Sequence, residues 1–331
     1  MKSMHKLMPN NKYSIYMILA VLFLICTFAN PNFLSVTNMT NISTQLAVTT
    51  ILAFGATILI ISGNLDLSAG SVLALSGVFA VMAYKATGSL AVSVVTGMLT
   101  GVVCNIINAV MISTFKAPPF IATLAMMAMA RGVALQVTAG QNILQLGDFV
   151  VLGQGKLGIV PIPVLFLIAI GILTWYLLNH TRFGRSLYAV GGNEEASVAS
   201  GINVHKVKYT AFIINGIFVG LAGVLFMSRV NAGLPNGAVG YEFTALTAAV
   251  IGGTSFSGGI GTAGGTLAGA FIVGFLDNIM NLTGVGSYIQ QIIRGAIIAL
   301  AVIYDIQSKN RRTRRTLGRI EEKTILNNKV G

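Results

Sequence analysis

Long apolar runs recur along the chain from Tyr13 to Asp305, and short polar segments separate them. A helix needs about 17–25 apolar residues to cross the hydrocarbon core of a bilayer, and about ten runs approach that length. They lie at Tyr13–Ala29, Ile42–Ser62, Leu67–Tyr84, Leu90–Thr114, Phe120–Thr138, Ile162–Leu178, Tyr209–Ser228, Phe243–Gly253, Thr262–Met280 and Tyr288–Tyr304. The eighth run is short. The pattern predicts an all-α integral membrane protein with about ten transmembrane helices.

Composition supports this class. The 331 residues are 54% hydrophobic and only 9% charged, whereas about a quarter of the residues in soluble domains are charged. The first run follows three lysines and no small-residue cleavage site follows it, so we expect an uncleaved anchor helix. The predicted domains are a cytoplasmic amino terminus at 1–12, a single transmembrane domain at 13–305 and a basic cytoplasmic tail at 306–331.

Basic residues predict the orientation, because cytoplasmic loops carry an excess of lysine and arginine. In the predicted topology the amino terminus, Lys116, the 180–208 segment and the tail share one side, while Lys85, Lys156 and Arg229 lie on the other. Both termini are therefore expected in the cytoplasm. The net charge is +12, and the largest basic cluster, Lys309–Arg315, comes directly after the last run. That position indicates contact with membrane lipid rather than with nucleic acid.

Polar residues inside the apolar runs are costly at membrane depth, so each is expected to face another helix, a cavity or a transport pathway. Asp66 and Ser68 interrupt two runs and are predicted to cap the following helix, with substrate contact as the alternative for Asp66. For the other candidates both helix-to-helix hydrogen bonding and pathway lining remain open. The candidates are Asn64, Asp66, Ser68, Asn105, Asn108, Phe120, Arg131, Glu242, Asp277, Asn278 and Arg294.

Two sequence features predict how the helices pack. Arg131 and Arg294 each precede a glycine and an apolar stretch, in runs that the predicted topology orients oppositely. This favours an inverted internal repeat, which is common in transporters. Small residues four apart allow helices to approach closely in a membrane. Inside the apolar runs, three such pairs of glycines are present, Gly97/Gly101, Gly216/Gly220 and Gly265/Gly269.

The 180–208 segment is a long polar stretch in an otherwise apolar chain. Within it Asn193 is placed to cap a short helix, Glu194 and Glu195 complement the positive helix end, and Gly201 is placed to end it. Apolar residues at Ala196, Val198, Ala199 and Ile202 predict a face that docks against a partner. A solvated connector is the alternative.

Motifs for catalysis and for metal or nucleotide binding are missing from the sequence. It has no phosphate-binding loop of the G-x-x-x-x-G-K-[ST] type. The glycine pattern from Gly259 to Gly264 lacks the strand and the acidic partner of a dinucleotide site. Cys26 and Cys104 lack the spacing of a metal knuckle, and every histidine lies outside the apolar runs. We therefore expect a transport subunit that binds no cofactor and no metal.

Four motifs carry a resemblance to a known family. They are Ile61–Ser71, Pro119–Leu124 with Arg131-Gly132, Phe183–Ala196, and Ile251–Ser255 with Gly258-Gly259. From Thr40 to Asp305 the chain resembles the permease subunits of bacterial ABC importers for monosaccharides of the ribose, xylose and galactoside type, which are related to branched-chain amino-acid permeases. Asn64 and Ala69 depart from the residues common in that family.

The resemblance implies an assembly in the bacterial plasma membrane. Its parts would be a second copy or a paralogue of the permease, an ATPase subunit that uses ATP and Mg, and an extracytoplasmic sugar-binding protein. A ribose-like pentose is the first expectation for the solute. The loop contacting the ATPase would include Gly184, Arg185, Gly192, Asn193, Glu194, Glu195, Ala196 and Gly201. An ion-coupled secondary transporter is the alternative, with Asp66 and Asp277 as its candidate carboxylates.

Overall fold

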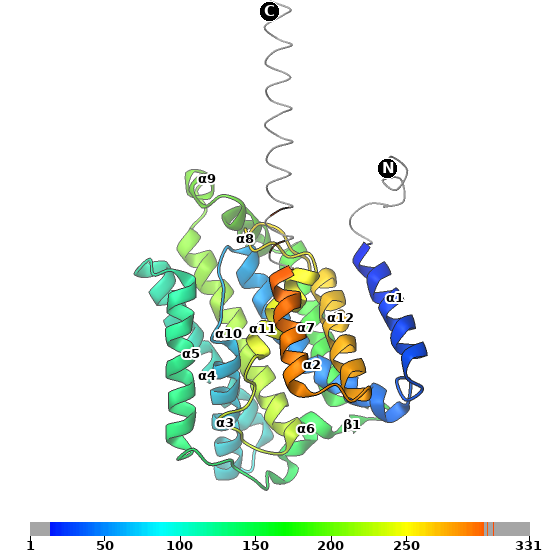
Figure 1. Cartoon of the computed structure of the whole chain (residues 1–331). Coiled ribbons are helices and arrows are strands. Elements are labelled where there is room, and N and C mark those ends of the chain that lie inside the picture. The colour runs from blue at the N-terminus through cyan, green and yellow to red at the C-terminus, as the bar shows by residue number, and fades with distance from the viewer. Residues whose placement is uncertain (1–13, 301–302, 304–306, 308–331) are drawn as a thin grey trace, which may run out of the picture.

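The computed structural model describes residues 14–300, 303 and 307, which form a helical bundle with one small β-hairpin (Figure 1). The hairpin pairs β1 (Lys156–Leu157) with β2 (Val160–Pro161) in antiparallel register. The helices are α1 (Ser14–Ala29), α2 (Val36–Ile61), α3 (Ala69–Thr87), α4 (Leu90–Ala109), α5 (Pro119–Val137), α6 (Val151–Gln154), α7 (Ile162–His180), α8 (Arg182–Gly192), α9 (Glu194–Ala199), α10 (Val204–Val230), α11 (Tyr241–Ile251) and α12 (Ala263–Leu282). A π-helical turn (Val110–Thr114) extends α4, a 3-10 turn (Gly147–Val150) precedes α6, and residues 287–300 are also helical.

Seven of the described helices are long and apolar enough to cross a membrane: α2, α3, α4 with its π-helical extension, α5, α7, α10 and α12. This agrees with the prediction of an all-α membrane protein. Within the described residues, each predicted apolar run overlaps a helix. However, α1 and α11 are shorter apolar helices, and the run Tyr288–Tyr304 extends beyond the described residues. The predicted termini at 1–12 and 306–331 lie outside the described residues except for residue 307.

Helices α2 and α10 form the centre of the bundle. In their most apolar windows 89% of α2 and 78% of α10 is buried, compared with 22–28% for α4, α5 and α7. Exposed apolar side chains such as Ile172 on α7 therefore suit contact with lipid rather than with water.

Glycines let α4 and α10 approach until their backbones touch. A Cβ added to Gly101 would lie 2.2 Å from the carbonyl oxygen of Gly216, and one added to Gly220 would lie 2.4 Å from that of Gly97. Nothing larger than a hydrogen atom fits at this contact. The predicted small-residue face Gly97/Gly101 of α4 therefore packs directly on the face Gly216/Gly220 of α10. The third face, at Gly265 and Gly269, packs against α11.

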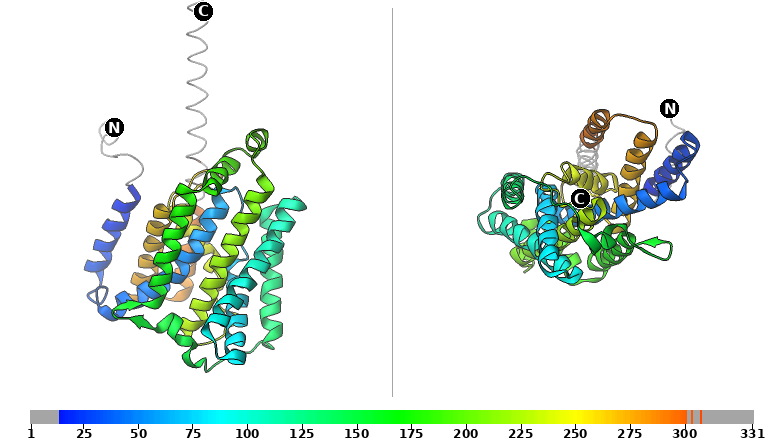
Figure 2. Two further views of the ribbon diagram at one scale, coloured as in Figure 1. Left: turned by 180° about the vertical axis from the view of Figure 1, so that it is seen from behind. Right: turned by 90° about the horizontal axis from the view of Figure 1, so that it is seen from below.

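The central helices α2 and α10 run in opposite directions (Figures 1 and 2). Each packs on its own pair of helices: α10 on α3 and α4, and α2 on α11 and α12. Within each pair the members also contact each other. In Figure 1, α5 and the helix at 287–300 run oppositely as well.

The two ends of the bundle differ. Helices α8 and α9 lie at one end, together with the beginning of α1 and the end of the helix at 287–300, whereas α6 and the β-hairpin lie at the other (Figure 1). Between α2 and α3, the non-helical segment 62–68 turns back into the interior. Such backbone is tolerated at membrane depth only where protein surrounds it or it lines a cavity, and Asn64, Asp66 and Ser68 are indeed buried.

Candidate functional site

Residues 181–201 form two helices, α8 and α9, which are called the α8–α9 segment below. The hydroxyl of Thr181 accepts a hydrogen bond from the Gly184 amide at 3.0 Å and so caps α8. A Cβ at Gly184 would lie 2.4 Å from the carbonyl oxygens of both Leu177 and Leu178. Glycine is therefore needed where α8 turns back on the end of α7.

Helix α9 matches the predicted short helix. The Asn193 side chain accepts from the Ala196 amide at 2.8 Å, which confirms the predicted cap. Glu194 and Glu195 occupy the first turn, where they complement the helix dipole. Gly201 has φ +79°, a left-handed conformation that suits glycine and ends the helix region.

The α9 surface is open on this single chain. Ala196, Val198 and Ala199 are exposed, and Val198 is 60% exposed. Glu194 forms an ion pair with Lys208 of α10 at 2.7 Å, whereas Glu195 is exposed. Of the four apolar residues predicted to dock, these three are not covered by their own chain and are available to another protein, whereas Ile202 packs against the core of the bundle.

Helix α8 is seated tightly on the rest of the bundle. A Cβ at Gly191 would lie 1.7 Å from the carbonyl oxygen of Ile61, the last residue of α2. The same carbonyl accepts from the Gly259 amide at 2.8 Å. The Tyr188 hydroxyl donates to the carbonyl oxygen of Gly261 at 2.7 Å, and burial raises the pKa of this phenol. The end of α8, the end of α2 and the loop before α12 therefore form one rigid junction.

Four of the predicted polar residues meet in the centre of the bundle, joined by Asn215, which the sequence analysis did not single out. The Asn215 amide donates to Asp66 at 2.8 Å and to Asn105 at 2.9 Å. The Asn108 amide donates to the Ser68 hydroxyl at 3.1 Å, and Ser68 bonds to Asp66. All five side chains are at most 5% exposed. We call these five residues the buried polar network.

The predicted capping role of Asp66 is corrected by this geometry. Ser68 is the N-cap of α3 and makes no side-chain cap bond. Asp66 instead accepts from the backbone amide of Ser68 at 2.8 Å, which is an Asx turn within the non-helical segment. Asn64 acts locally too, since its amide donates to the carbonyl and hydroxyl oxygens of Ser62. These residues shape the entry to α3 and do not cap its free amides.

Arg131 of α5 binds the loop that leads to α11. Its guanidinium donates to the carbonyl oxygens of Pro235 at 2.6 Å and Gly237 at 2.8 Å. Glu242, in the first turn of α11, accepts from the Gly240 amide at 3.2 Å. Both side chains thus bond to the loop that joins α10 to α11. This second group therefore connects α5 with the start of α11.

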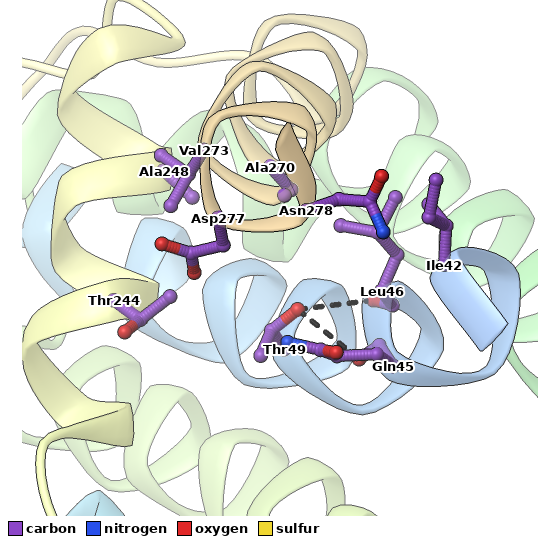
Figure 3. A pocket seen from close by; sticks show the side chains of 11 residues that line it. Ile42, Gln45, Leu46, Thr49, Thr244, Ala248, Ala270, Val273, Asp277 and Asn278 are labelled. Atoms are coloured by element: carbon purple, nitrogen blue, oxygen red, sulfur yellow. Dashed lines mark hydrogen bonds between the residues drawn. The ribbon is translucent and has the colours of Figure 1, made fainter. Parts of the chain in front are cut away.

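The remaining candidates lie around α12. Asp277 pairs with Arg294 at 2.9 Å, and Asn278 exchanges two amide hydrogen bonds with Asn38 of α2. Asp277 also lines a small pocket among α2, α11 and α12, where it lies near Thr244 (Figure 3). The pocket has room for about one water molecule in this conformation.

The predicted residues thus divide among separate places, and Phe120, at the beginning of α5, is 56% exposed and joins none of the polar groups. Two participants were not singled out, Asn215 and Tyr188. Tyr188 lies inside the Phe183–Ala196 motif, but both side chains bond to residues far away in the chain, so no local pattern predicts their contacts. Adjacent glycines at 191–192 and 258–259 were the available signal of a close backbone contact.

Among the described residues, no group of three or more His, Cys, Asp or Glu side chains could hold a metal ion.

Comparisons with known proteins agree with this architecture. Residues 38–302 match the family described as branched-chain amino acid transport system / permease component. The ribose import permease protein RbsC of Escherichia coli K12 is 39% identical over 295 residues, which cover 87% of this chain and 91% of that protein. RbsC of Bacillus subtilis 168 is 38% identical over 290 residues, with 87% and 90% covered. The L-arabinose transport system permease protein AraH of Escherichia coli K12 is 35% identical over 305 residues, with 92% and 93% covered.

No solved structure matches the chain significantly. The family match spans most of the sequence and includes the buried polar network, the α8–α9 segment and the loop before α12. This chain therefore belongs to the family of membrane permease components of branched-chain amino acid transport systems and their relatives.

Proposed function

We propose that this chain is the membrane-spanning permease subunit of an ATP-driven importer in a bacterial plasma membrane. The α8–α9 segment carries the proposal, because it presents exposed apolar and acidic side chains on α9 while α8 is locked to the bundle. That combination suits a part that receives force from a partner and transmits it. The sequence has no phosphate-binding loop, so ATP and Mg would be used by a separate ATPase subunit.

The contacts suggest how the force would travel. Movement of α9 would reach the beginning of α10 through the pair of Glu194 and Lys208. Movement of α8 would reach the end of α2 through the contact of Gly191 with Ile61, directly before the non-helical segment 62–68. The segment would thus act on both central helices at once, as alternating access between two bundle arrangements requires.

The solute is proposed to be a monosaccharide, and a ribose-like pentose is the first choice. The relatives support this, since their names describe import of ribose and transport of L-arabinose. Selection would rest mainly with an extracytoplasmic sugar-binding protein, because tight binding inside the membrane would slow release. A second copy of this chain or a paralogue would complete the membrane part of the importer.

We also propose ten crossings with both termini in the cytoplasm. In support, the α8–α9 segment and the loop before α5 lie at one end of the bundle, and the less basic loops lie at the other (Figure 1).

The proposed inverted repeat relates α2 to α10, α3 to α11, α4 to α12 and α5 to the helix at 287–300. The equivalent neighbour relations of α2 and α10 support this assignment. Family membership does not favour the alternative of an ion-coupled secondary transporter.

Uptake of labelled ribose in cells that express the complete transport system tests the proposal. Depletion of ATP with the ion gradients maintained should abolish uptake, whereas an ionophore with ATP maintained should leave most of it. Uptake that continues without ATP but stops with the ionophore would contradict the proposal of an ATP-driven importer and favour the ion-coupled alternative. Labelled L-arabinose serves as the second solute in case ribose is not carried.

A further inference from the structure

Asp66 is a carboxyl group buried at the centre of the bundle, and no basic side chain of the described residues pairs with it. Its exposed fraction is 5%. The ion pairs among the described residues join Glu194 to Lys208 and Asp277 to Arg294, and neither includes Asp66. A buried ionised carboxylate is strongly unfavourable unless a positive charge compensates it. Asp66 is therefore either a neutral acid or an ionised carboxylate that something other than a basic side chain of the described bundle balances.

The charged side chain beside the start of α3 does not supply a positive charge. It is a second carboxylate, Glu242, whose Oε2 would lie 2.0 Å from a Cβ added to Gly70 of α3. Arg131 donates its hydrogen bonds to the carbonyl oxygens of Pro235 and Gly237 in the loop before α11. Among the described residues, Asp66 accepts hydrogen bonds from Ser68 and Asn215 and forms no ion pair.

Asn108, which belongs to the same network, has a buried side-chain oxygen without a hydrogen-bond partner among the described residues. Its side chain is fully buried, and its Nδ2 donates to the Ser68 hydroxyl. Its Oδ1 atom accepts no hydrogen bond within the described part of the chain. A buried oxygen acceptor without a partner is unfavourable, and contact with a cation would satisfy it as well as it would satisfy Asp66.

The oxygens of the buried polar network are close together. Asp66 Oδ2 and Asn105 Oδ1 both accept from the same Asn215 nitrogen, at 2.8 and 2.9 Å. The Ser68 hydroxyl bonds to Asp66 on one side and accepts from Asn108 on the other. These oxygens come from α4 and from the non-helical segment before α3. In secondary transporters, the backbone carbonyls of unwound segments coordinate sodium, and here the oxygens beside the non-helical segment belong to side chains.

We propose that Asp66, Ser68, Asn105 and Asn108 bind a resident sodium ion that holds the 62–68 segment against α4. A single carboxylate matches the charge of a monovalent ion, whereas calcium sites usually gather several carboxylates. The ion stays bound during transport and supplies no driving force. This inference rests on the buried polar network and does not depend on the importer function.

Thermal unfolding of the purified full-length chain in detergent tests the site. Sodium chloride is compared with N-methyl-D-glucamine chloride at fixed pH and ionic strength. The melting temperature should rise steadily with the logarithm of the sodium concentration, because a ligand of the native state stabilises it by mass action. Asp66→Asn should abolish this dependence. Asn108→Ala removes one oxygen ligand. This variant should need about ten times more sodium than the wild type for the same rise in melting temperature. The matched control Asp277→Asn, at the carboxylate paired with Arg294, should keep the sodium dependence.

Equal melting temperatures of the wild type in both salts would overturn the proposal. Asp66 would then be a neutral acid, and Asp66→Asn would be as stable as the wild type. If Asp66→Asn does not fold, Asn108→Ala alone decides, since an unchanged sodium dependence in that variant also overturns the site. The assay needs neither ATPase nor sugar, so this proposal and the importer function can fail separately.

Discussion

Gly191 has no room for a side chain. A Cβ there would lie 1.7 Å from the Ile61 carbonyl oxygen and 2.6 Å from the Gly259 amide nitrogen. Both neighbours are backbone atoms, which cannot move aside as the end of a flexible side chain could. The adjacent Gly192 has nothing within 4 Å of an added Cβ. Of these two consecutive residues, only Gly191 must therefore be glycine for steric reasons.

This difference predicts opposite outcomes for two alanine substitutions. Gly191→Ala should destabilise the folded protein by about 1–3 kcal/mol, the usual cost of overpacking a filled interior. Gly192→Ala should change stability by no more than about 0.5 kcal/mol, as is typical of exposed positions. Melting temperatures of the two purified variants check this. Equal stability of both variants would show that α8 is not seated on the end of α2.

At the residue scale, sequence reasoning succeeded where the interaction is local. The cap by Asn193 depends on a residue three positions away and was predicted correctly. The contacts of Asn215 and Tyr188 were missed because their partners lie 149 and 73 residues away. The role of Asp66 was mistaken for a related reason, since the path of segment 62–68 depends on α4 and α10 and not on the segment alone.

At the element scale, the contact of α4 with α10 depends on small residues at one face of each helix. Gly101 and Gly216 bring the two backbones together, and the buried polar network lies further along the same helix pair. The sequence predicted these small-residue faces, since a spacing of four places residues on one helix face. It could not predict that two of the three faces are partners, because pairing is a tertiary property.

Gly101→Ala should therefore destabilise the protein by about 1–3 kcal/mol, because its Cβ would lie 2.2 Å from the Gly216 carbonyl oxygen. The matched control is Gly132→Ala, a helical glycine of α5 with nothing within 4 Å of an added Cβ. That control should be neutral or stabilising by up to about 1 kcal/mol. Chemical or thermal unfolding of both variants measures the difference. A Gly101→Ala protein as stable as the control would contradict the close contact.

At the scale of the whole molecule, apolar periodicity indicated where most helices lie, because a helix in lipid must be both long and apolar. The short α11 and the added helix α8 were less visible, since one is short and the other amphipathic. The arrangement around α2 and α10 was only suggested by two Arg-Gly pairs. In the structure those arginines have different partners, so the neighbour relations of whole helices support the repeat better than the motif does.

The proposed topology predicts which end of the bundle faces the cytoplasm. Ile159 at the hairpin tip is 93% exposed, and Glu195 is exposed at the opposite end. Both native cysteines are buried, so they should react little. In intact cells, a membrane-impermeant maleimide should label an Ile159→Cys variant and leave a Glu195→Cys variant unlabelled until the cells are opened. The opposite labelling pattern would invert the topology.

The central claim is that α9 is the contact through which a separate ATPase acts on this permease. The most direct measurement is co-purification of the tagged chain from its native membrane, followed by mass spectrometry of the bound proteins. We predict an ATPase with a phosphate-binding loop bound to the wild type. With Glu194→Ala and Glu195→Ala combined, that ATPase should be lost while the permease remains in the membrane. A wild-type chain that purifies without any ATPase, or a double variant that retains it in full, would contradict the account.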